Sequence, residues 1–208
     1  MDKHFEFRRK AIHILFGILI CSLIYFDLFY LPLWLGILFL VIISSFVLKK
    51  WKSYSKFAPQ IWRPLANFIF LFEREEEIRK FPLRGALTFF SGCILSYILF
   101  PKIIAISAII TLFVGDSAVA LYGFYFGRIK NPLSPKKHLD ATIFGIILNS
   151  IFLALFLPFW KGFLASVPAL ILENFMPIPK IKKIFFRLIL DDNILIPLIA
   201  GSILMLLV

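Results

Sequence analysis

Residues 115–145 read GDSAVALYGFYFGRIKNPLSPKKHLDATIFG, and the apolar run IAISAIITLFV at 104–114 leads directly into them. Asp116 is therefore embedded in a segment that is apolar enough to cross a membrane. A carboxylate at membrane depth costs several kcal/mol unless it is paired, hydrated or bound to a metal ion. Asp116 is for this reason the first candidate for a functional residue.

The composition indicates a helical membrane protein. Of the 208 residues 61% are hydrophobic, 26 are Phe, and the mean hydropathy is +0.92. Soluble globular domains have apolar contents near one half, so the composition argues against a soluble domain. We expect an all-α, polytopic membrane helix bundle that forms one domain, residues 1–208, because no repeat or linker divides the chain.

The apolar runs predict about seven transmembrane helices, since a spanning helix needs roughly 20 mostly apolar residues. The last two runs are close to the lower limit of length. Residues 49–84 form the longest polar segment, in which an interfacial helix is expected over 57–72. The expected spans are 11–30, 33–48, 84–100, 103–125, 141–160, 162–176 and 194–208.

The positions of the basic residues predict the orientation of the bundle. Lys and Arg number 4 in residues 1–10, 9 in 49–84, 4 in 127–140 and 4 in 177–192, out of 23. Seven spans with a cytoplasmic N-terminus put these four segments on the cytoplasmic face, as the positive-inside rule requires. We therefore interpret the net charge of +11 as topology and not as nucleic-acid binding. We expect a multi-pass protein of a prokaryotic cytoplasmic membrane whose polar motifs face the cytoplasm.

Two charged motifs each have a simple interpretation beside a functional one. Arg9, Lys10 and His13 are helical neighbours at i,i+3 and i,i+4 spacing, and a basic membrane anchor with an interfacial histidine would explain them. The acidic run at 73–77 is typical of a solvated helix start. It would alternatively bring carboxylates to a metal ion or to a basic partner such as Arg9.

A face of small residues follows Asp116. Ala120, Gly123 and Gly127 come at i+4, i+7 and i+11 from Asp116, and the pair of glycines permits a close helix neighbour. That neighbour is either internal or in a second subunit, so a homo-oligomer stays open. The loop that follows offers cations and backbone N–H groups for phosphate binding. Its basic residues are Arg128, Lys130, Lys136 and Lys137.

Further carboxylates come near the C-terminal end of the chain. Glu173 lies near the end of the sixth expected span, and Asp191, Asp192 and Asn193 open the seventh. A helix N-cap would explain Asp192 or Asn193. Adjacent carboxylates also chelate divalent cations, and the expected topology puts all of these residues and Asp116 on one side of the bilayer. We therefore predict a site for a metal ion and a nucleotide. Its metal ligands would be Asp116, Asp191, Asp192 and Asn193.

In combination these motifs resemble the CTP-dependent lipid kinase family of dolichol kinase, phytol kinase and the CTP-using diacylglycerol kinase. The family usually has Ser, any residue, Glu and Gly after the lysine, where this chain has HLDA at 138–141. Asp140 keeps a carboxylate that is one methylene shorter. The resemblance covers most of the chain, in RKAIH at 9–13, EREEE to PLRGALTFFSG at 73–92, IAISAIITLFVGDSAVALYGFYFGR at 104–128, PKKHLDATIFG at 135–145, LILE at 170–173 and DDNILIPL at 191–198.

The resemblance implies a phosphotransferase that moves the γ-phosphoryl group of CTP, with Mg²⁺, to the hydroxyl of a membrane lipid alcohol. The alcohol is a polyprenol such as dolichol, a phytol-like isoprenoid alcohol or diacylglycerol, with its tail among the apolar spans. The implied catalytic residues are Asp116, Asp140, Glu173 and Lys137, where either Asp140 or Glu173 orients the hydroxyl. The implied phosphate-binding residues are Gly115, Gly123, Gly127, Arg128, Lys130, Lys136 and Lys137. The residues implied to bind lipid phosphate or to brace the site are Arg9, Lys10, His13, Glu75 and Glu76.

Other functions fit parts of the sequence. SPKK at 134–137 after Gly115-Asp116 is similar to phosphatidate cytidylyltransferase, but the C-terminal signature of that family, Lys-Asp followed by His-Gly-Gly and Asp-Arg, is absent. A transporter also places an aspartate in the membrane, but usually shows internal repeats, and none is found here. A purely structural membrane protein would have no use for Asp116, Glu173 and Asp191 together.

Overall fold

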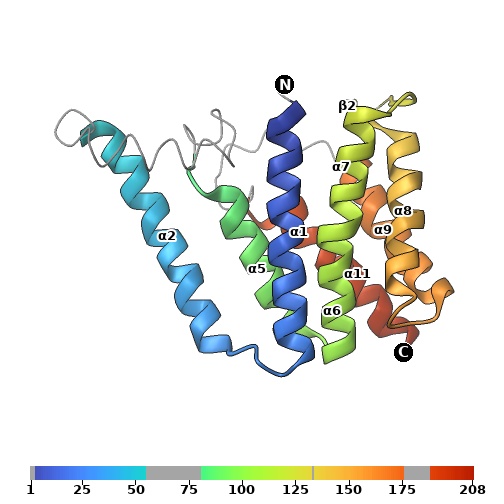
Figure 1. The fold of residues 1–208 in the computed structure, drawn as a ribbon, viewed down its shortest axis with the longest axis horizontal. Helices are drawn as coiled ribbons and strands as arrows, with labels where there is room; N and C mark the ends of the chain where they lie inside the picture. Colours follow the sequence, from blue (N-terminus) through green and yellow to red (C-terminus); the bar gives the residue numbers. More distant parts are fainter. Residues whose placement is uncertain (1–2, 55–80, 133, 176–187) are drawn as a thin grey trace.

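The structure is a computed structural model that describes residues 3–54, 81–132, 134–175 and 188–208. Apart from one short hairpin, its regular structure is helical, and successive long helical segments run in alternating directions (Figure 1). The elements are α1 (Lys3–Tyr25), α2 (Leu31–Tyr54), α5 (Arg84–Leu99), α6 (Lys102–Ile110), the π-helix η1 (Thr111–Gly115), α7 (Asp116–Tyr125), β1 (Lys130–Asn131), β2 (Ser134–His138), α8 (Leu139–Leu153), α9 (Phe159–Phe175) and α11 (Asp192–Leu207).

The two ends of the bundle differ. One end carries the start of α1, the end of α7 and the strands β1 and β2, and the C-terminus lies at the other (Figure 1). We name the first the hairpin end. The chain enters the hairpin end with α1 and returns to it between α7 and α8, so segments that are distant in the sequence meet there.

Two helical segments are long and apolar enough to cross a membrane, Leu31–Lys49 and Lys102–Tyr125. The second is the central element of the bundle: 89% of the residues in its apolar 18-residue stretch are buried, against 17% in that of the first. Four further segments are apolar but shorter, and a helix of 16 residues such as α5 spans about 24 Å, against roughly 30 Å for a hydrocarbon core. The described residues confirm an all-helical bundle, but they do not confirm seven spanning helices.

Several helix ends lie away from the expected ones. The first helix ends at Tyr25 and not at 30, because the chain turns at Asp27 with a positive φ of 60°. The expected span 141–160 ends early, at Leu153, and α9 begins at Phe159, where the Pro158 carbonyl accepts a hydrogen bond from the Lys161 N–H. In contrast, α2 continues beyond the expected end at 48 to Tyr54, through the polar sequence KKWKSY. The interfacial helix expected over 57–72 lies outside the described residues.

The segment 127–140, expected to be a loop, forms a hairpin. Strands β1 and β2 pair antiparallel, with Lys130 opposite His138 and Asn131 opposite Ser134. Asn131 is 1% exposed, and the Leu139 N–H donates to the Ile129 carbonyl at 2.8 Å. Strands this short leave no alternating pattern in the sequence, which is why the sequence alone did not predict them.

Two glycines allow α1 and α8 to approach the central η1–α7 segment closely. A Cβ at Gly17 of α1 would lie 2.2 Å from the Phe113 ring, and a Cβ at Gly145 of α8 would lie 2.4 Å from Val119 Cγ2. Both separations are far shorter than a van der Waals contact. The segment that carries Asp116 is therefore held between two helices at close range.

Candidate functional site

Asp116 forms a buried ion pair with Lys10 of α1. The Lys10 Nζ donates a hydrogen bond to Asp116 Oδ2, and the two residues are 5% and 8% exposed. The His13 Nε2 lies 3.6 Å from the same oxygen and has no hydrogen-bond partner in the described part of the chain. Removing one partner of a buried pair leaves an uncompensated charge. Asp116 and Lys10, which are 106 residues apart in the sequence, are thus neutralised by each other.

The backbone that leads to Asp116 is a π-helical turn. Asp116 is the first residue of α7, directly after η1. The Asn149 Nδ2 of α8 donates to Thr111 Oγ1 of η1 at 3.1 Å and to Ser166 Oγ of α9 at 2.8 Å, which ties the turn to two neighbouring helices. Single π-helical turns within α-helices are rare and often occur at functional sites. The chain therefore fixes an unusual backbone conformation immediately before its buried carboxylate.

Asp191 has a structural role between α5 and α11. Its Oδ2 accepts a hydrogen bond from Arg84 Nη2 at 2.7 Å, and its Oδ1 accepts one from the Asn193 N–H at 3.2 Å as the N-cap of α11. The Asn193 Nδ2 in turn donates to Thr88 Oγ1 at 3.0 Å. A Cβ at Gly92 would lie 2.1 Å from the Asn193 carbonyl oxygen, so the two helices touch here. Hydrogen bonds between helices thus engage Asp191 and Asn193, two of the expected metal ligands.

Asp192 connects the hairpin with the buried ion pair. Its Oδ2 lies 4.0 Å from the Lys137 Nζ of β2, and the two side chains are 37% and 27% exposed. The charges of Lys137, Asp116, Asp191 and Lys10 all act on the Asp192 carboxylate. The structure therefore brings two carboxylates, Asp116 and Asp192, and two lysines within electrostatic range of one another at the hairpin end.

The Asp140 carboxylate accepts hydrogen bonds from the backbone that follows α7. Its Oδ2 accepts a hydrogen bond from the Arg128 N–H at 2.8 Å, and its Oδ1 accepts one from the Ile129 N–H at 3.4 Å. Desolvation raises the pKa of Asp140, but these backbone donors outweigh it, so the pKa lies below its ordinary value. Because the backbone engages both oxygens, the geometry favours a structural role for Asp140 over the orientation of a substrate hydroxyl.

The small-residue face of α7 packs within the chain. A Cβ at Gly123 would lie 3.3 Å from the Ala141 Cβ, and one at Gly127 would lie 2.5 Å from the His138 ring. Of the two neighbours that the sequence left open for this face, the structure therefore supplies the internal one, at the junction of β2 and α8.

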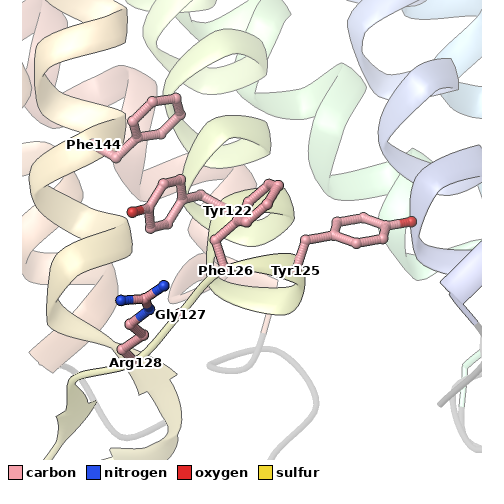
Figure 2. A pocket seen from close by; sticks show the side chains of 6 residues that line it. All are labelled: Tyr122, Tyr125, Phe126, Gly127, Arg128 and Phe144. Atoms are coloured by element: carbon pink, nitrogen blue, oxygen red, sulfur yellow. The ribbon is translucent and has the colours of Figure 1, made fainter.

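Arg128 lies beside an open hollow of about 750 Å³ between the ends of α7 and α8 (Figure 2). The rings of Tyr122 and Phe144 stack there with centroids 4.5 Å apart, whereas Tyr125 points to the opposite side of α7 (Figure 2). In the described part of the chain, no hydrogen bond or ion pair joins the Arg128 side chain to Asp116 or Asp192. Of the expected phosphate-binding cations, Lys137 lies near the acidic groups and Arg128 lies beside this hollow.

The remaining predicted residues have different positions. Arg9 forms a 3.0 Å ion pair with Glu6, and Lys130 is exposed on β1. Lys136 belongs to β2 and Glu173 to the last turn of α9, and their side chains are not among those described. Glu75 and Glu76 lie outside the described residues.

Sequence reasoning missed several polar residues around the site. Glu6 is 3% exposed and pairs with Arg9, and Arg84, expected only as the start of a span, pairs with Asp191. Asn149 carries the link between η1 and α9. An amide or a cation inside or beside an apolar run was the available signal for Asn149 and Arg84.

The described side chains limit which kind of metal site the protein could form. Within the described ranges, no group of three or more His, Cys, Asp or Glu side chains is placed to hold a metal ion. Mg²⁺ in nucleotide sites is usually held by one or two carboxylates together with phosphate oxygens and water. Asp116 and Asp192 suit that kind of site, whereas Asp191 and Asn193 are engaged between α5 and α11.

Comparison with known proteins does not add a family assignment. No protein-family model, no curated protein and no solved structure matches this chain.

Proposed function

We propose that the chain is a CTP-dependent kinase that phosphorylates the hydroxyl of a membrane lipid alcohol. One observation carries the proposal: Lys10, Asp116, Lys137 and Asp192 converge at the hairpin end from four distant segments. Catalysis of phosphoryl transfer is almost entirely positioning and electrostatic stabilisation. Carboxylates that can bind Mg²⁺, next to lysines that can bind phosphate, would provide both the positioning and the electrostatic stabilisation. The family resemblance of the sequence motifs provides the choice of CTP and of a lipid acceptor.

We further infer that the bundle is embedded in a membrane with its hairpin end at the cytoplasmic face. Large apolar side chains on three helices point outward, with Leu15 65%, Phe39 62% and Ile143 60% exposed. Soluble monomers rarely expose apolar surface on this scale. The start of α1 and the strands β1 and β2, which belong to basic segments of the sequence, lie at the hairpin end, which agrees with the positive-inside rule (Figure 1). The shorter helices would then lie where the bilayer is locally thin.

In this proposal Asp192 and Asp116 would hold Mg²⁺. When bound, the ion would offset the negative charge of the nucleotide's phosphate groups. We assign Asp191 and Asn193 to the contact between α5 and α11 instead.

The four residues that converge at the hairpin end, which we call the cluster, have separate roles in the transfer. The bond between the γ-phosphorus and the oxygen that leaves with CDP breaks, and the lipid hydroxyl oxygen forms the new bond to phosphorus. Lys137 binds the phosphate oxygens of the nucleotide and offsets their negative charge before and throughout this step. Lys10 keeps the Asp116 carboxylate fixed at the depth where a lipid hydroxyl arrives, and the hydroxyl proton passes to a carboxylate of the cluster.

The test is a turnover assay with the purified, bilayer-reconstituted protein. CTP, ATP, GTP and UTP are each paired with a polyprenol, a phytol-like isoprenoid alcohol and diacylglycerol, and both products are measured. We expect release of CDP together with a lipid monophosphate, and loss of both when the divalent cation is chelated. Release of pyrophosphate from CTP with phosphatidate would contradict the proposal and favour the cytidylyltransferase reaction. Absence of turnover with every pair would also contradict it.

A further inference from the structure

Ser117 differs from the other buried hydroxyl residues of the described chain. Its Oγ is buried and has no hydrogen-bond partner there, although the residue is only 1% exposed. The other buried serines and threonines each donate to a backbone carbonyl; they are Ser45, Thr88, Ser96, Ser107, Thr111, Thr142, Ser150 and Ser166. An unsatisfied buried hydroxyl carries a free-energy cost, so Ser117 calls for an explanation.

Ser117 comes two residues after the end of the π-helical turn η1. Helical serines commonly donate to the carbonyl four residues earlier, as Ser150 does to Ile146 at 2.6 Å. For Ser117 that carbonyl belongs to Phe113, which lies within η1. In a π-helix the backbone bonds run over five residues, which shifts the carbonyls relative to an α-helix. The turn therefore leaves the Ser117 hydroxyl available to another acceptor or donor.

Ser117 is one of the residues that line an apolar groove of about 380 Å³. Ile14 and Ile18 of α1 form one wall, Leu148 and Phe152 of α8 form the other, and the η1–α7 segment forms the base. Ile18 is 52% exposed and Phe152 is 43% exposed, so the groove opens at the outer surface of the bundle. Its lining is otherwise almost entirely hydrocarbon.

The groove shares the helices α1 and α7 with the buried ion pair. Lys10, Ile14 and Ile18 follow one another at i,i+4 spacing, which puts them on the same face of α1. Asp116, the partner of Lys10, is the residue next to Ser117. An apolar chain in this groove would therefore have its polar head beside the carboxylate.

We propose that this groove binds the apolar chain of the lipid alcohol and that the Ser117 hydroxyl forms a hydrogen bond with the hydroxyl of that alcohol. The inference rests on the proposed function for the identity of the lipid. A water-soluble ligand would need several polar groups to fix its orientation, whereas a single hydroxyl in a hydrocarbon-lined groove matches a ligand with one hydroxyl and a long tail. The outer opening gives such a ligand entry from the bilayer.

Photo-crosslinking tests the groove without requiring turnover. The full chain in nanodiscs is irradiated with a long-chain alcohol that carries a diazirine in its tail, and the labelled residues are mapped by mass spectrometry. We expect labelling concentrated on Leu148 and Phe152, and a several-fold loss of it in Ile18→Trp, whose indole fills the groove. Leu19→Trp is the matched control, because Leu19 is 46% exposed on a different face of α1. Even labelling over all outward-facing residues, or equal labelling of both variants, would overturn the proposal.

A second comparison tests Ser117 itself. In competition with the probe, a long-chain alcohol should bind the native protein roughly 2- to 10-fold more tightly than the matching alkane, as expected for one neutral hydrogen bond. Ser117→Ala should remove this preference, whereas Ser150→Ala should keep it. An unchanged preference in Ser117→Ala would contradict the assignment.

The two proposals fail in distinguishable ways. If the groove is labelled as expected but no nucleotide phosphorylates any alcohol, the kinase function fails and the lipid-binding groove stands. If turnover with CTP occurs but Ile18→Trp and Ser117→Ala change neither labelling nor the KM for the alcohol, the groove is wrong and the kinase function stands.

Discussion

Two aspartates near the hairpin end each pair with a cation from a distant helix, but their surroundings differ. Asp116 pairs with Lys10, and the two side chains are 11% and 6% exposed. Asp191 pairs with Arg84 at 2.7 Å, with side chains that are 13% and 23% exposed. The second oxygen of Asp191 caps α11, whereas Asp116 continues directly from η1 and caps no helix.

The difference separates a structural pair from a candidate functional one. Asp191 satisfies an N–H group at the start of a helix and joins α5 to α11, which explains its presence without any substrate. The Lys10–Asp116 pair satisfies no helix end and puts two charges in a buried place. A buried ion pair is often no more stabilising than apolar residues of the same shape. Under the proposed function, the Lys10–Asp116 pair belongs to the site.

The largest effect on stability is expected for Asp116→Asn. This change leaves the Lys10 ammonium buried without a counter-charge, which should lower the free energy of unfolding by roughly 3–5 kcal/mol. Adding Lys10→Met to the same chain should restore most of that loss but no turnover. Denaturant unfolding of the native chain, the single variant and the double variant in the same detergent measures the three free energies of unfolding. Equal stability of Asp116→Asn and the native chain would show that Lys10 does not depend on this carboxylate.

A smaller effect is expected for Lys137→Gln, and it should appear in nucleotide binding. Hydrogen bonds to charged groups contribute roughly 1.5–3 kcal/mol, so the KM for CTP should rise roughly 10- to 100-fold. Stability should hardly change, because the Lys137 and Asp192 side chains are 27% and 37% exposed and 4.0 Å apart. Steady-state kinetics separates KM from kcat. A fall in kcat at constant KM would remove Lys137 from ground-state phosphate binding.

Asp191→Ala tests the structural half of the comparison. Loss of an N-cap lowers the free energy of unfolding by roughly 0.5–2 kcal/mol. The loss of its bond from Arg84 should add to this, while kcat/KM should fall by less than about tenfold because Asp191 does not touch substrate in this account. The free energy of unfolding and kcat/KM of Asp191→Ala and of the native chain are measured on the same preparations. If a stably folded Asp191→Ala had no turnover, Asp191 would belong to the functional site together with Asp116, and the distinction between the two pairs would be wrong.

The smallest effect is expected at the opposite end of the bundle. Lys102 and Asp27 form a 2.7 Å ion pair, but their side chains are 40% and 80% exposed. Such pairs contribute roughly 0–1 kcal/mol. Lys102→Gln should therefore leave both turnover and the unfolding midpoint close to native values, and it serves as the charge-loss control for Lys137→Gln. A marked loss of turnover would place functional groups at both ends.

Much of the fold was predictable from the apolar runs. Each expected span corresponds to one helical segment, and the run at 103–125 is the most buried of the two long ones. The helix ends were not predictable, because hydropathy reports which residues avoid water and not where the backbone turns. The hairpin at 130–138 was missed because its strands are too short for a periodic pattern.

Some residues that the structure brings together were identified from the sequence, but their pairings were not. Asp116 and Lys10 were both identified from the sequence, yet nothing in it fixes which turns of two helices meet. The contact of Arg84 with Asp191 could not be predicted for the same reason. Ser117 was overlooked because its exceptional state depends on the π-helical turn before it, for which the sequence TLFVG carries no known signal.

The most direct test of the central claim compares Asp116→Asn with Asp191→Asn, two isosteric changes that each remove one paired carboxylate. Turnover of CTP with the preferred lipid alcohol is measured for both in the presence of Mg²⁺. We predict that Asp116→Asn lowers kcat by roughly 100- to 1,000-fold, as for the loss of a group that stabilises the transition state, and that Asp191→Asn stays within about tenfold of native. Near-native turnover in a folded Asp116→Asn, or an equal loss in both variants, would contradict the account.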